Sequence, residues 1–157
     1  MVRRTRRIIT AAGIAVIGAL VSFMLLPYIQ NSKNAEFKKS IDSIAFDSIS
    51  LTQEYQGEEG KWGNNQYDNK TMIAIVDKYL PKYQELIDRA KALDTPERYT
   101  NAKDLLIKSM QAEKDSNEHF RNYLATGDAA EREKSDDLFN QAFAYSGSYD
   151  AAIKAAG

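Results

Sequence analysis

The chain has 157 residues, of which 43% are hydrophobic and 27% charged, and this composition excludes a wholly disordered chain and suits one globular domain. It contains no cysteine, which excludes disulfides, thiolate metal sites and thiol catalysis. Four of the 21 basic residues lie within residues 1–7, so residues 30–157 carry 17 basic against 22 acidic residues. That acidic excess argues against nucleic acid as a partner, because it repels phosphate backbones.

Residues 8–29 form an uncharged apolar run of 22 residues. As a helix this run would span roughly 33 Å, enough to cross a bilayer core of about 30 Å. A basic cluster precedes it, which the positive-inside rule keeps in the cytoplasm, and a tyrosine at its far end suits the headgroup layer. The residues that set this topology are Arg3, Arg4, Arg6, Arg7 and Tyr28. We therefore expect a single-pass anchor in the cell membrane, with residues 1–7 cytoplasmic and residues 30–157 extracytoplasmic.

A cleaved secretory signal is the alternative to this anchor. Signal peptides usually carry an apolar stretch of about 7–15 residues and a small-x-small cleavage site. Here the run is longer, and the one candidate site, Lys-Asn-Ala at 33–35, has lysine where a small residue is needed. An uncleaved anchor is therefore the better interpretation. A row of small residues within it (Ala11, Ala15, Ala19) would let it pair with a second copy or with another membrane protein, although such rows are common in membrane helices.

Apolar residues recur at helical spacing through four segments of the outer domain: 31–56, 70–93, 96–126 and 129–156. Pro81 lies inside the second segment, where it predicts a bend. Thr95 and Pro96 predict the start of the third segment, as cap and first helical residue. Gly127 predicts its end and Asp128 caps the fourth.

Short turns between the last three segments force neighbouring helices to run antiparallel. The predicted fold class is therefore all-α, a transmembrane helix followed by an up-down antiparallel four-helix bundle. The alternative is a three-helix bundle on a helical stalk, with 31–56 as the stalk.

Residues 56–69 contain three glycines and three asparagines, which predict a loop. Its aromatic residues, Trp62 and Tyr67, are candidates for binding a partner, since exposed loop aromatics often do so. In the alternative, which we favour, Trp62 folds back and caps the end of the bundle. Asn69 begins an Asn-Lys-Thr sequon, a candidate N-glycosylation site in an extracytoplasmic domain.

No constellation of catalytic or metal-binding residues emerges from the sequence. His119, with Asp115 and Glu118 nearby, lacks the paired Glu-x-x-His motifs of a bundle metal site and is interpreted as a surface residue. The acid pairs at 58–59 and 136–137 match no calcium loop and are interpreted as solvated charge. We expect no enzymatic activity, no metal and no cofactor.

Tyrosines on the apolar stripes are the one hint of an internal site. Buried tyrosines need hydroxyl partners and can line a polar pocket between helices, but ordinary core packing is the favoured interpretation. The residues concerned are Tyr79, Tyr83, Tyr99, Tyr123 and Tyr149.

The order of these parts resembles small membrane-anchored helical proteins of archaea, especially ammonia-oxidising ones. The resemblance is carried by Gly-Lys-Trp at 60–62, Tyr-Leu-Pro-Lys-Tyr at 79–83, Leu-Asp-Thr-Pro at 93–96 and Tyr-Leu-Ala-Thr-Gly-Asp at 123–128. It implies the anchored bundle and supplies no functional residue.

Three functions follow from the sequence. The first is a membrane-anchored interaction or scaffold protein, such as an accessory subunit of a membrane complex. The second is a ligand-sensing bundle resembling the outer domains of chemoreceptors, although these normally return through a second membrane helix and no such helix follows Ile153. The third, an enzyme or metal carrier, has no support from the residues.

Overall fold

A computed structural model describes the backbone of residues 2–157 and the side chains of residues 30–157. Over this range the chain is helical, with no strand, and it divides into two units, residues 1–38 and 39–157. Four α-helices and one short 3-10 turn make up the described backbone: α1 (Val2–Gly63), α2 (Asn69–Ala92), η1 (Glu97–Tyr99), α3 (Thr100–Thr126) and α4 (Ala129–Ala156). The prediction of an all-helical protein is confirmed.

The unit of residues 1–38 consists of the first part of α1. The predicted anchor, residues 8–29, and the topology residues Arg3, Arg4, Arg6, Arg7 and Tyr28 lie outside the residues whose side chains are described. Among the residues that are described, no helix has the length and apolarity to cross a membrane.

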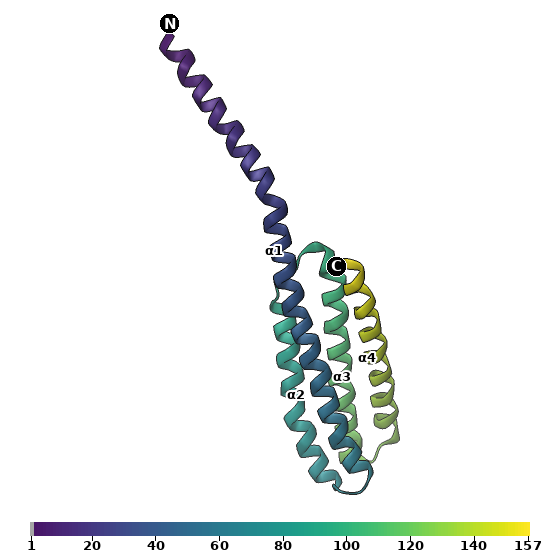
Figure 1. The fold of residues 1–157 in the computed structure, drawn as a ribbon. Coiled ribbons are helices and arrows are strands. Elements are labelled where there is room, and N and C mark those ends of the chain that lie inside the picture. The colour runs from purple at the N-terminus through teal and green to yellow at the C-terminus, as the bar shows by residue number, and fades with distance from the viewer. Residues whose placement is uncertain (1) are drawn as a thin grey trace. The chain divides into compact units, whose positions relative to one another are not determined.

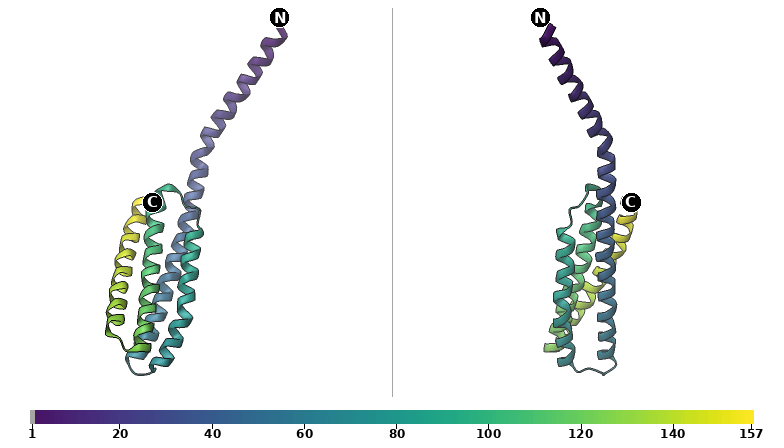
Figure 2. Two further views of the ribbon diagram at one scale, coloured as in Figure 1. Left: turned by 180° about the vertical axis from the view of Figure 1, so that it is seen from behind. Right: turned by 60° about the vertical axis from the view of Figure 1, so that its left-hand side comes forward.

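The unit of residues 39–157 is a bundle of the last part of α1 with α2, α3 and α4, joined by short connections at alternating ends (Figures 1 and 2). The three-helix alternative fails because α1 contributes to the core of this unit. Ile41 is fully buried, and Tyr55 packs in one cluster with Met72 and Val76 of α2 and with Phe120 of α3.

Local signals place most helix ends within a residue of prediction. Asp68 accepts a hydrogen bond from the backbone nitrogen of Thr71 at 2.7 Å and caps α2. Gly127 ends α3 in the left-handed conformation, with φ 75°, and Asp128 caps α4 through Ala130. Pro81 lies inside α2, as predicted.

Two boundaries were predicted wrongly. The first helix continues to Gly63, so the connection predicted at 56–69 shrinks to residues 64–68. Each helical glycine costs only about 1 kcal/mol, and the contact of Trp62 with Phe120 near the helix end offsets part of that cost. The third helix does not begin at Pro96, because the hydroxyl of Thr95 donates back to Leu93 instead of capping; η1 intervenes and α3 starts at Thr100.

Two glycine-to-alanine substitutions test the extension of α1. Gly57 lies in α1 without a positive φ, and Gly127 holds the left-handed cap; a Cβ has open space at both. We expect Gly57→Ala to raise the free energy of unfolding by about 0.5–1 kcal/mol, because alanine favours helix. Gly127→Ala should lower it by about 1 kcal/mol, because its φ disfavours a side chain. Urea unfolding of the full chain, followed by circular dichroism, measures both changes in stability. A loss of stability in Gly57→Ala would contradict the extension of α1 and favour the loop predicted at residues 56–69.

Candidate functional site

A groove runs between α1 and α4, with α3 forming its floor, within residues 39–157. It holds two cavities of about 300 Å³ and about 370 Å³. Gln56 of α1, Glu113 of α3 and Phe139 of α4 line both cavities, so the two adjoin along the groove. Volumes of this size are those of small-molecule pockets.

The floor of the groove is a polar face of α3. Four buried polar residues occupy one side of this helix: Ser109, Glu113, Ser116 and Asn117. The two serines donate hydrogen bonds to backbone carbonyls of α4, Ser109 to Ala142 at 2.9 Å and Ser116 to Ser135 at 2.8 Å. These bonds hold α4 against α3, since short side chains allow the two backbones to come close.

Glu113 is the buried carboxyl of the groove, only 7% exposed. The hydroxyl of Tyr83 on α2 donates to its Oε1 at 3.0 Å. Burial raises the pKa of Glu113 above the ordinary value for glutamate, while hydrogen bonding from Thr52 and Tyr83 acts in the opposite direction. Burial also raises the pKa of Tyr83, so its hydroxyl stays protonated and donates.

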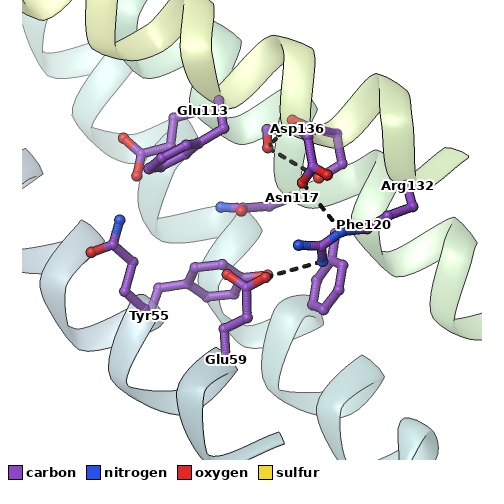
Figure 3. A pocket seen from close by; sticks show the side chains of 11 residues that line it. Tyr55, Glu59, Glu113, Asn117, Phe120, Arg132 and Asp136 are labelled. Atoms are coloured by element: carbon purple, nitrogen blue, oxygen red, sulfur yellow. Dashed lines mark hydrogen bonds and ion pairs between the residues drawn. The ribbon is translucent and has the colours of Figure 1, made fainter. Parts of the chain in front are cut away.

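Two residues that line the first cavity each carry a buried polar atom that makes no hydrogen bond: the hydroxyl oxygen of Tyr55, and the amide nitrogen of Asn117, which lies near the Tyr83 hydroxyl. The residues are 3% and 4% exposed. In Figure 3 the amide nitrogen of Asn117 points into the space between Glu113 and Tyr55. Leaving such a group unpaired costs roughly 1–3 kcal/mol, so native proteins rarely do it without a reason.

The charged groups at the edge of the first cavity are paired with one another. Arg132 of α4 reaches Glu59 of α1 at 3.2 Å and Asp136 at 3.2 Å. Its guanidinium also lies 4.9 Å from the ring centroid of Phe120 (Figure 3). Arg132 is therefore already engaged by two carboxylates and an aromatic ring.

The second cavity is more apolar than the first. Ile49 of α1 and Phe139 and Phe143 of α4 line it, and all three side chains are exposed, Phe143 to 78%. Exposed aromatic residues beside a cavity are suited to covering an apolar molecule.

Trp62 and Tyr67 close the end of the bundle formed by α1 and α2. The ring of Trp62 meets Phe120 edge-on at 5.2 Å, and its Nε1 donates to Asn69 at 3.0 Å. Tyr67 donates its hydroxyl to Glu58 at 2.8 Å. The capping interpretation of Trp62 is thus confirmed. Trp62 lies in the last turn of α1, which corrects its assignment to a loop, and its binding of a partner stays a prediction.

Both polar atoms of the Asn69 side chain are engaged. Its Oδ1 accepts from Trp62, and its Nδ2 donates to the carbonyl of Leu124 at 3.1 Å. A glycan on Nδ2 would compete with the second bond. Glycosylation of Asn69 stays a prediction.

His119 has a different partner from those its sequence neighbours suggest. Its Nδ1 lies 2.7 Å from Glu131 of α4, and this contact lowers the pKa of that carboxyl. No group of acidic or histidine side chains among the described residues is arranged to hold a metal ion.

Replacement of Glu113 by glutamine tests its protonation. The unfolded chain releases this proton at a lower pH than the folded chain, because burial raises the folded pKa. The free energy of unfolding should therefore fall as pH rises from the ordinary glutamate pKa to the raised pKa of Glu113. Glu113→Gln should remove this part of the dependence on pH. Denaturant unfolding across this pH range measures it, with Glu133→Gln on the exposed face of α4 as the control. An unchanged slope in Glu113→Gln would mean that the carboxyl is ionised in the fold.

Comparison with models of protein families, with characterised proteins and with solved structures finds no match. The resemblance to archaeal membrane-anchored proteins therefore stays a prediction.

Proposed function

We propose that this chain is a membrane-anchored, non-catalytic protein that binds a small molecule in the groove between α1 and α4. Residues 8–29 would hold it in the bilayer, and residues 30–157 would present the groove outside the cytoplasm. Of the functions expected from the sequence, this one corresponds to the ligand-sensing bundle.

The observation that carries the proposal is the pair of unpartnered atoms on Tyr55 and Asn117. They belong to residues of different helices, α1 and α3, that line the same cavity. Because a buried polar group without a partner destabilises the fold, two in one cavity indicate a molecule that satisfies them when bound.

Nothing in the groove supports a reaction. The carboxyls of the first cavity are held by Arg132 and Tyr83, and His119 lies outside the residues that line either cavity. A binding role needs only the shape and the hydrogen-bonding groups present.

A scaffold or accessory-subunit function is the second candidate, and one observation favours it. Phe46 and Phe143 are 70% and 78% exposed, and aromatic side chains are enriched where one protein binds another. Copurification of a stoichiometric membrane partner, retained when the groove is blocked by Gln56→Phe, would favour this function.

Removal of the unpartnered groups should stabilise the protein without ligand. We expect Tyr55→Phe and Asn117→Leu each to raise the free energy of unfolding by up to about 1 kcal/mol, because each removes a buried polar group without a partner. Tyr83→Phe is the matched control, since its hydroxyl bonds to Glu113; it should lower stability by about 1 kcal/mol.

Chemical unfolding of the full-length variants gives these values. A loss of stability in Tyr55→Phe and Asn117→Leu as large as that in Tyr83→Phe would show that both groups are satisfied within the protein. The proposed binding function would then lose its basis.

The membrane topology has a direct test, because the chain contains no cysteine. Single cysteines are introduced at Val2, before the basic cluster, and at Lys154, near the end of α4. A membrane-impermeant maleimide applied to intact cells should label Lys154→Cys and leave Val2→Cys unlabelled until the cells are opened. Labelling of Val2→Cys alone would reverse the orientation, and release of labelled Lys154→Cys into the medium would indicate a cleaved signal.

A further inference from the structure

We propose that the ligand of this groove is an uncharged molecule that has a hydrogen-bond-accepting oxygen, such as a ketone, at one end and an apolar body at the other. This inference rests on the proposed binding function and names the chemistry of the ligand. It follows from the unpartnered atoms, from the paired charges around them and from the apolar second cavity.

The acceptor oxygen is required by Asn117. Its unpartnered Nδ2 is a donor and cannot accept, so only an acceptor can satisfy it. The hydroxyl of Tyr55, in the same cavity, can donate to the same oxygen, because burial raises the pKa of Tyr55 and keeps it protonated. A carbonyl oxygen, which has two lone pairs, would accept from both.

A cationic ligand fits these groups poorly. An ammonium group offers only donors, so it would leave Nδ2 of Asn117 unpaired and facing a positive charge. Glu59 and Asp136, which would attract a cation, are already paired with Arg132.

An anionic ligand fits no better. Three carboxyl groups line the first cavity, those of Glu59, Glu113 and Asp136. Arg132, the cation that also lines it, is shared between two of them. A buried anion would have to compete for that guanidinium and lie close to Glu113, so its desolvation would go uncompensated.

The apolar body of the ligand follows from the second cavity. The groove continues from Glu113 and Phe139 into the space lined by Ile49 and Phe143. These side chains are exposed in the free protein, and a ligand that covered them would gain about 25 cal/mol for each Å² of apolar surface removed from water. The polar end therefore lies at Asn117 and the apolar part extends toward Phe143.

Three probes of one size separate the ligand classes: cyclohexanone, cyclohexylammonium and cyclohexanecarboxylate. Each is titrated into the full-length protein in one detergent, and binding is followed by the backbone amide resonances of Ser116 and Phe120, which line the first cavity and are present in every variant. We expect cyclohexanone to give a saturable shift, with an affinity at least tenfold above that of either ion. Asn117→Leu and Tyr55→Phe should each weaken its binding severalfold or more.

Two further variants serve as controls, one that blocks access of the probe to the groove and one that adds the same ring outside it. Gln56 is exposed and lines both cavities, so Gln56→Phe should block the groove and abolish the shift. Lys78→Phe adds the same ring on the exposed side of α2, lines neither cavity, and should bind cyclohexanone as the unaltered protein does.

Tighter binding of either ion would overturn the proposed ligand chemistry while leaving a binding groove in place. Equal binding of all three probes that is indifferent to Asn117→Leu, or saturable binding of none, would overturn the proposed chemistry too. A separate result would overturn the binding function itself: a loss of stability of the free protein in Tyr55→Phe and Asn117→Leu.

Discussion

The hydrogen bonds between α3 and α4 are the constraint on which the groove depends. Ser109 and Ser116 donate to the backbone of α4, and their length fixes how closely that helix lies on α3. Small residues line the second cavity on both helices, Ala45 and Ser48 on α1 and Ala142 and Ser146 on α4. Since protein interiors are otherwise close-packed, small side chains on both sides leave a groove open.

The same face of α3 determines the electrostatics of the site. Glu113 lies between the two serines on the helix, so the bonds that hold α4 also enclose its carboxyl. Tyr83 reaches it from α2, which joins a third helix to this polar region. The buried carboxyl is therefore supported by the hydroxyls of Tyr83 and Thr52, and its residue lines both cavities.

Helix boundaries that depend on local chemistry could be predicted from the sequence, whereas features that depend on contacts between distant residues could not. Gly127 and Asp128 mark a helix boundary by their own backbone and side-chain preferences, and both were predicted. The end of α1 depends instead on Trp62 packing against Phe120, a residue of another helix. The residues of the groove were missed for the same reason, because Tyr55 and Asn117 line one cavity only in the folded bundle. A signal was nevertheless present: Ser109, Glu113, Ser116 and Asn117 put polar residues on the core-facing side of α3.

The unpartnered groups give the strongest physical reason to regard this face as functional. A core built for stability alone would carry phenylalanine at position 55 and leucine at position 117, since neither change alters the packing much and each removes a desolvation cost. Natural proteins retain such costs where a site has to recognise something. The adjacent serines show that this bundle does satisfy buried polar groups where they serve packing. The contrast within one helix face, between partnered serines and an unpartnered asparagine, separates the part that holds the fold together from the part that the proposed ligand would contact.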